Sequence, residues 1–228
     1  MTTALTVLQL DTCFPRVPGD VACAQSYCAK VEIIRIPQAQ VSNIVTSDPS
    51  CVDIAPFADA LAQARGEVIA TSCGFLAYWQ QHLEALTDRP FIASALNALN
   101  RLNTPADRTA ILTFDADTLM AGHRALITGR AAHVVGLRPD MHLREVIKQD
   151  ARALDETLAA REIAHLVAQS VPERCNTLVL ECTNLPPYKK AIADQFGGQI
   201  IDILTEIEHC RPGTVAPAFL SLTPDAAL

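Results

Sequence analysis

The sequence predicts an α/β fold with two pseudo-symmetric lobes, each a mostly parallel four-stranded sheet with helices on both faces, and an active site between the lobes. Short apolar runs typical of buried strands alternate with apolar residues at helical spacing. The four strands predicted in the second half begin 101 to 110 residues after their counterparts in the first. We expect an N-terminal lobe over 1–103, a C-terminal lobe over 104–210, and a tail over 211–228 that packs loosely or crosses back.

The first half reads as four strands separated by loops and helices. Apolar runs predict strands over 5–10, 31–36, 67–71 and 90–93. The segment 13–20, CFPRVPGD, holds two prolines and a glycine and is expected to be a loop. Apolar residues at helical spacing predict helices over 54–65, from just after Gly74 to Leu86, and over 94–102.

The second half repeats this order. Strands are predicted over 109–114, 132–137, 177–181 and 199–204. Helices are predicted over 117–128, over 143–169 with a break near Arg161, and from Pro186 to Phe196. Proline suits the first turn of a helix, and Gly197-Gly198 end the last one.

Charge and motifs exclude several classes of function. The net charge is −7 without a Lys/Arg cluster, which argues against nucleic acid or an anionic membrane as partner. The sequence has no long apolar run and no basic amino-terminal region, so we expect a cytoplasmic protein with reduced thiols. It contains no G-x-G-x-x-G, no P-loop and no H-E-x-x-H. The expected chemistry therefore needs no cofactor and no metal.

Two cysteines occupy matching positions in the two halves. Cys73 follows the strand 67–71, Cys182 follows the strand 177–181, and each precedes a predicted helix. Asp11 and Asp115 end the first strands of the two halves, in LQLD and LTFD. Parallel sheets bind ligands at the carboxyl ends of their strands. If the lobes face each other, these four residues line one cleft, although aspartates at strand ends also cap helices and turns.

Two opposed thiols suit proton transfer at carbon. Backbone N–H groups at a helix start favour a thiolate and can cradle a carboxylate. One thiolate would remove a proton from the carbon beside the carboxylate, and the opposite thiol would return one to the other face. Buried cysteines more often act as small hydrophobes, and we expect that role for the other six: Cys13, Cys23, Cys28, Cys51, Cys175 and Cys210.

The segments LQLDT, TSCGF and LECTNLPPY resemble the active-site segments of the aspartate/glutamate racemase superfamily, which includes hydantoin racemases. The segment LDTCFPRVPGD resembles an uncharacterised branch of it. The resemblance implies a cofactor-independent isomerase with Cys73 and Cys182 as its acid–base pair, and a homodimer. It implies substrate contacts from the neighbouring segments, namely Asp11, Thr12, Ser72, Gly74, Phe75, Thr113, Asp115, Thr183 and Asn184.

The residues that follow Cys73 do not specify the substrate. Cys73 is followed by Gly74-Phe75 where amino-acid racemases usually show Asn-Thr. We therefore expect a racemase or epimerase of a small carboxylic or amino acid. The alternatives are an enzyme like maleate isomerase or arylmalonate decarboxylase, with Cys182 as nucleophile or proton donor, and a non-catalytic carboxylate-binding protein.

Overall fold

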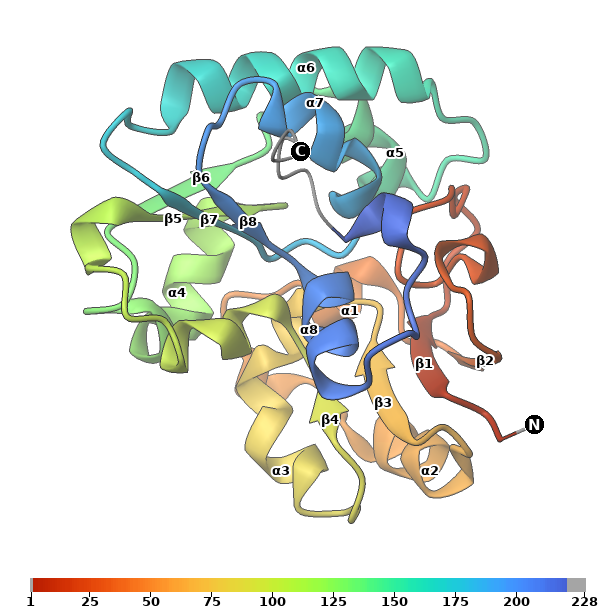
Figure 1. Cartoon of the computed structure of the whole chain (residues 1–228). Coiled ribbons are helices and arrows are strands. Elements are labelled where there is room, and N and C mark those ends of the chain that lie inside the picture. Colours follow the sequence, from red (N-terminus) through yellow and green to blue (C-terminus); the bar gives the residue numbers. More distant parts are fainter. Residues whose placement is uncertain (1, 221–228) are drawn as a thin grey trace, which may run out of the picture.

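A computed structural model describes residues 2–220 and shows two lobes, each built on an all-parallel four-stranded sheet (Figure 1). The first sheet has the strand order β2-β1-β3-β4 and the second the order β6-β5-β7-β8, so the predicted fold class and its duplication are confirmed. The strands are β1 (Leu5–Leu10), β2 (Val31–Ile36), β3 (Val68–Thr71), β4 (Phe91–Ile92), β5 (Thr109–Thr113), β6 (His133–Gly136), β7 (Thr177–Leu180) and β8 (Gln199–Ile201).

The apolar runs form strands because both faces of each sheet are covered. Every residue of β3, β5 and β7 is buried, as expected for central parallel strands. In the first sheet, Leu5 on β1 pairs with Val31 on β2 and with Val68 on β3. This parallel register brings the carboxyl ends of the strands to one edge, where the segments after β1, β3, β5 and β7 meet.

Eight α-helices surround the sheets in the described part of the chain. Figure 1 shows α6 and α7 on one side of the second sheet and α4 on the other. Their bounds are α1 (Val41–Ile44), α2 (Ala55–Gln63), α3 (Gln80–Glu84), α4 (Ala116–Ile127), α5 (His142–Gln149), α6 (Glu156–Ser170), α7 (Lys189–Ala193) and α8 (Ile203–Cys210). None of these helices is long and apolar enough to cross a membrane.

Three predicted helices are wholly or partly 3₁₀ turns. The segment after Cys73 forms η3 (Gly74–Trp79) and only then the short α3, and the segment predicted over 94–102 is η4 (Ala95–Asn100). The segment after Leu185 opens with η6 (Pro186–Tyr188) and continues into α7. Gly74 to Ala77 are all buried, so η3 has no single apolar stripe of the kind that stabilises an amphipathic α-helix.

The predicted break in the long helical stretch lies at residue 150 and not near Arg161. Helix α5 ends at Asp150, which adopts the left-handed conformation with φ of 50°, and α6 begins after the cap Asp155. The Asp150 carboxylate accepts hydrogen bonds from the backbone N–H of Cys13 and of Phe14, at 2.6 and 3.0 Å. The break therefore anchors the loop of the first lobe that follows β1.

The chain returns to the first lobe earlier than predicted. The strand expected over 199–204 ends at Ile201, and Asp202 caps α8 through a capping box with Thr205. Ile203, Leu204 and Ile207 of α8 join the apolar cluster on one face of the first sheet, with Leu5, Val7, Val68 and Ala70. Thr214 and Ala216 also bond to the segment 26–29. The first lobe is thus completed by residues from 203 onward, while 221–228 of the predicted tail lie outside the described residues.

Candidate active site

A narrow cavity lies between the lobes at the carboxyl ends of the strands. Its volume is about 30 Å³, which is room for only a few water molecules at roughly 10–15 Å³ each. The two lobes therefore lie close together at this place. The lining residues are Leu10, Phe14, Arg16, Val41, Val45, Ser72, Cys73, Gly74, Phe75, Phe114, Ile147, Glu181, Cys182, Thr183 and Asn184.

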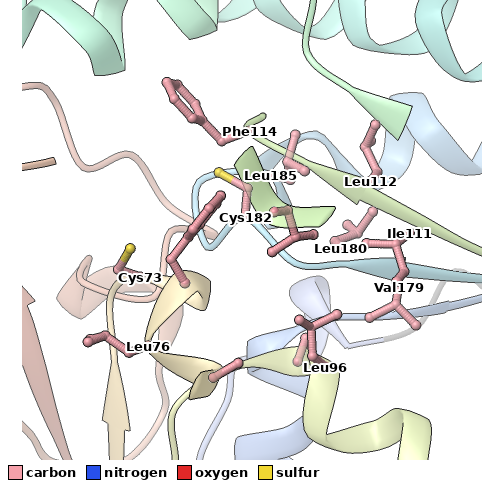
Figure 2. Packing of buried hydrophobic residues seen from close by; sticks show 14 of the residues in the cluster. Cys73, Leu76, Leu96, Ile111, Leu112, Phe114, Val179, Leu180, Cys182 and Leu185 are labelled. Atoms are coloured by element: carbon pink, nitrogen blue, oxygen red, sulfur yellow. The ribbon is translucent and has the colours of Figure 1, made fainter. Parts of the chain in front are cut away.

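Cys73 and Cys182 reach this cavity from opposite lobes. Cys73 caps η3 after β3, and Cys182 follows β7, at the equivalent place in the second sheet. Figure 2 shows the two sulfur atoms projecting into the same region, below Phe114. Both side chains are free thiols, 8% and 7% exposed. The structure thus brings the two predicted catalytic residues together.

The pKa values of both thiols are raised, contrary to the expectation of lowered values. Burial and the Glu181 carboxylate raise the pKa of the Cys73 thiol to about 12, against the lowering effects of the Phe75 backbone N–H and of Arg16. Burial, Glu181 and Cys73 raise the pKa of Cys182 well above its usual value, although the Asn184 backbone N–H opposes them. The expected donors at the turn start are present, but the loss of hydration in the closed cavity outweighs them.

Glu181 is a buried carboxyl group between the two lobes. Its Oε2 accepts a 2.6 Å hydrogen bond from the Thr113 hydroxyl, while Oε1 has no hydrogen-bond partner in residues 2–220. The carboxyl fits against Gly74, because a β-carbon built there would lie 2.2 Å from Oε1. Burial raises the pKa of Glu181 to about 7, despite the opposing Thr113 hydrogen bond.

Two hydrogen bonds join the lobes beside the thiols. The Thr183 hydroxyl donates to the Ser72 carbonyl at 2.7 Å, and the Asn184 amide donates to Asp20 Oδ2 at 2.6 Å. The Cys182 thiol in turn lies 3.8 Å from Asn184 Oδ1 and can donate to it. Residues next to the two cavity cysteines therefore hold the lobes together.

Arg16 places a positive charge in the cavity wall. Its guanidinium donates to the Thr12 hydroxyl at 2.9 Å and to Asp20 at 3.3 Å, and it stacks over the Phe14 ring at 4.3 Å. Its buried Nε has no acceptor among the described residues. A carboxylate entering the cavity would supply that acceptor.

Phe14, Phe75 and Phe114 form an apolar wall around these groups. The Phe75 carbonyl accepts a 2.7 Å hydrogen bond from the buried His123 ring, which holds η3 against α4. The cavity thus combines four charged or ionisable residues with an apolar lining, as small-molecule sites commonly do.

Four residues predicted to contact substrate lie behind or outside the cavity. The Asp11 carboxylate binds the Gln38 N–H and the Arg35 guanidinium, which hold its pKa below the usual value. Asp115 caps α4 and pairs with Arg144. Thr12 and Thr113 lie behind the cavity lining. The Thr12 hydroxyl accepts a hydrogen bond from Arg16, and the Thr113 hydroxyl donates one to Glu181. The remaining predicted residues, Ser72, Gly74, Phe75, Thr183 and Asn184, line the cavity itself.

The sequence reasoning missed Arg16, Asp20, Glu181 and the aromatic residues Phe14 and Phe114. Arg16 and Asp20 belong to the segment 13–20. Its prolines and glycine predict a loop, but they do not indicate where the charged side chains of that loop lie. Glu181 immediately precedes Cys182, so a carboxylate at the end of an otherwise apolar strand was the available signal. Within residues 2–220 no group of three or more His, Cys, Asp or Glu side chains is arranged to hold a metal ion.

The six other cysteines are only partly the buried hydrophobes expected. Cys23 and Cys175 are buried, whereas Cys13, Cys28, Cys51 and Cys210 are exposed. Loop and helix-end positions account for the exposed four, since they lie outside the strands and the packed helix faces.

Comparisons with known proteins agree with this architecture. The model of the Asp/Glu/hydantoin racemase family matches residues 24–207. The fold is similar to that of allantoin racemase from Pseudomonas fluorescens, with a TM-score of 0.63 at 12% identity over 98% of this chain and 99% of that one. Allantoin racemase from Klebsiella pneumoniae gives a TM-score of 0.58 at 13% identity, over 90% and 87% of the two chains.

A curated relative carries a different activity in its name. The chain is 23% identical, over 93% of its length and 75% of the relative's, to a dimethylsulfoniopropionate lyase of Durusdinium sp. clade D.

Proposed function

The chain belongs to the Asp/Glu/hydantoin racemase family, and from this premise we propose that it racemises or epimerises a small carboxylic or amino acid by proton transfer between Cys73 and Cys182. The observation that carries the proposal is the pair of free, buried thiols at matching strand ends, lining one cavity from opposite lobes.

The proposed reaction inverts the carbon next to a carboxylate. The Arg16 Nε donates to the carboxylate and holds that carbon between the two sulfur atoms. One thiolate takes the proton, the C–H bonding electrons move toward the carboxylate, and the Arg16 charge stabilises the resulting enediolate. The opposite thiol then donates its proton to the other face of the carbon and becomes the thiolate. A site with one thiol on each side works equally in both directions.

Proton exchange at carbon tests this proposal. Purified protein is incubated in deuterated water with a panel of D- and L-acids, and deuterium at the α-carbon is followed by NMR and mass spectrometry. The wild type is expected to label both enantiomers of its substrate, while Cys73→Ser and Cys182→Ser each lose interconversion. Cys175→Ser is the matched control, because Cys175 is also buried and free but lies outside the cavity. Equal behaviour of wild type and both catalytic-site variants on every compound turned over would refute two-thiol chemistry.

Elimination is a second candidate, favoured by the name of the curated relative. Its first step is the same: a thiolate removes the α-proton. The electron pair then forms a C=C bond while a β-substituent leaves with its own pair, so no second protonation at the α-carbon is required. An unsaturated acid and a released β-group, formed without solvent deuterium in recovered substrate, would identify this reaction.

The remaining alternatives make different use of Cys182. In isomerase or decarboxylase chemistry of the maleate or arylmalonate type, Cys182 attacks carbon or donates a proton alone. A covalent adduct trapped on Cys182 would identify the nucleophilic route. A non-catalytic carboxylate-binding protein predicts saturable binding with no exchange or turnover of any bound acid.

A further inference from the structure

We propose that Glu181 is the base that activates the two thiols: it takes the proton from whichever of Cys73 and Cys182 must become the thiolate. This inference deepens the proposed function and rests on its two-thiol chemistry. It adds a third proton-carrying group to the two thiols, whose raised pKa values favour the neutral form.

The geometry gives Glu181 an unused acceptor inside the cavity. Its side chain is 1% exposed and held at one oxygen by the Thr113 hydroxyl at 2.6 Å. The other oxygen, Oε1, faces Gly74, the residue after Cys73, and finds no hydrogen-bond partner within the described chain. Glu181 also directly precedes Cys182 in the sequence. A buried carboxyl oxygen left unpaired is costly, and this one lines the same cavity as the two thiols.

The duplication makes this residue stand out. The position before the catalytic cysteine is Ser72 in the first half and Glu181 in the second. The Ser72 hydroxyl accepts from the Leu10 N–H and serves the local fold. Only one thiol needs to be ionised at a time, so a single carboxylate between the lobes suffices for both directions of the reaction.

The groups around Glu181 favour a single negative charge shared among Glu181 and the two thiols. The titratable or charged side chains that line the cavity with Glu181 are Cys73, Cys182 and Arg16, while Asp20 and Tyr188 lie near Cys182. Asp20 is committed to Arg16 and Asn184. The ionised carboxylate raises the pKa of both thiols, so a charge on Glu181 disfavours a charge on either sulfur.

The proposed step is a transfer within this group. The S–H bond of one thiol breaks, an O–H bond forms at Glu181 Oε1, and the negative charge moves from the carboxylate to the sulfur. The net charge of the cavity is unchanged. The repulsion between carboxylate and thiolate disappears in the same step, because the carboxyl is neutral once the thiolate exists. Burial already raises the pKa of Glu181 to about 7, so the protonated and the ionised carboxyl coexist near neutral pH.

Thiol alkylation tests this step without a substrate. Iodoacetamide reacts with thiolate, and the rates at Cys73 and Cys182 are followed separately by peptide mass spectrometry from about pH 5 to about pH 10. The wild type is expected to show a step in rate near pH 7, where the group as a whole loses a proton. In Glu181→Gln this step is lost and the rate rises continuously with pH, because the amide neither gives up a proton near pH 7 nor repels a thiolate. At about pH 8 the variant is therefore expected to react about tenfold faster than the wild type.

Two further variants make the result decisive. Glu206→Gln is the control, since Glu206 is a buried carboxyl paired with Arg101 outside the cavity. In this variant the step in the alkylation rate of the two thiols near pH 7 is expected to persist. Thr113→Val keeps the carboxyl but removes the hydrogen bond that lowers its pKa, so the step moves to higher pH. A step that survives in Glu181→Gln, or that stays in place in Thr113→Val should Glu181→Gln not fold, overturns the role of Glu181. Loss of the step together with no α-proton exchange on any acid refutes the proposed function and leaves the proton transfer standing.

Discussion

The hydroxyl of Thr183, in the C-terminal lobe, donates a 2.7 Å hydrogen bond to the backbone carbonyl of Ser72, in the N-terminal lobe. Thr183 follows one cavity thiol and Ser72 precedes the other, so this bond sets how the two sulfur atoms face each other. The position of the thiols is therefore fixed by contacts between lobes as well as by the sheets that carry them.

Thr183→Val tests this contact. The substitution keeps the side-chain shape and leaves the buried Ser72 carbonyl unpaired, which is expected to cost about 1–3 kcal/mol of stability. Activity should fall further than stability, since the closed position of the lobes is lost. Thr104→Val is the control, because the Thr104 hydroxyl meets that of Thr177 at 3.1 Å away from the cavity. Denaturant unfolding and α-proton exchange measure the two effects, and equal activity losses in both variants would contradict the assignment.

Arg16→Lys tests carboxylate binding. Lysine keeps the charge but loses the Nε donor and the planar contact with Phe14. The Michaelis constant is expected to rise by about tenfold, the equivalent of one charge-assisted hydrogen bond of roughly 1.4 kcal/mol. Arg35→Lys, on the exposed pair with Asp11, is expected to leave the steady-state constants unchanged. An unchanged Michaelis constant in Arg16→Lys would remove Arg16 from the binding site.

Gly74→Ala tests the close fit of Glu181. The added methyl group would lie 2.2 Å from both the Glu181 backbone oxygen and its Oε1. The side chain can turn away, but the backbone oxygen belongs to the end of a buried strand, so the lobes must separate. We expect a loss of about 1–3 kcal/mol or more in unfolding free energy and a loss of activity. Gly197→Ala, which meets nothing within 4 Å, should be neutral in the same assays.

Stability should also depend on pH through Glu181. Its pKa rises from 4.5 to about 7 on folding, so the folded state binds the proton more tightly than the unfolded state. The associated stability is complete below about pH 4.5 and is lost as pH rises to about 7, for a total of about 3 kcal/mol. Glu181→Gln removes this slope. Unfolding free energies of both proteins across that interval measure it, and parallel pH profiles would contradict the burial of an ionisable carboxyl.

Local patterns were sufficient to predict the sheets. The strands 5–10 and 31–36 match β1 and β2 residue for residue, because both segments are short and rich in apolar and β-branched residues. The positions of Cys73 and Cys182 followed from the same patterns, since each lies after the equivalent strand of its own sheet.

Features that depend on contacts between distant segments were not predictable. Helix α8 was not predicted, because the segment 199–204 (QIIDIL) is mostly apolar and resembles a strand. Asp202 and Thr205, which form the capping box, were the available signal that a helix begins there. The raised pKa values of the thiols arise from closure of the second lobe over the first, and no spacing in the sequence encodes how tightly water is excluded.

The placement of α8 has a consequence for the order in which the protein is made. The face of the first sheet that carries Leu5, Val7, Val68 and Ala70 is covered by Ile203, Leu204 and Ile207. A ribosome synthesises this cover only after it has finished the entire second lobe. The nascent first lobe therefore has only Val21, Ala22 and Tyr27 of this cover while residues 109–201 are synthesised, so part of an apolar sheet face is exposed to aggregation during translation.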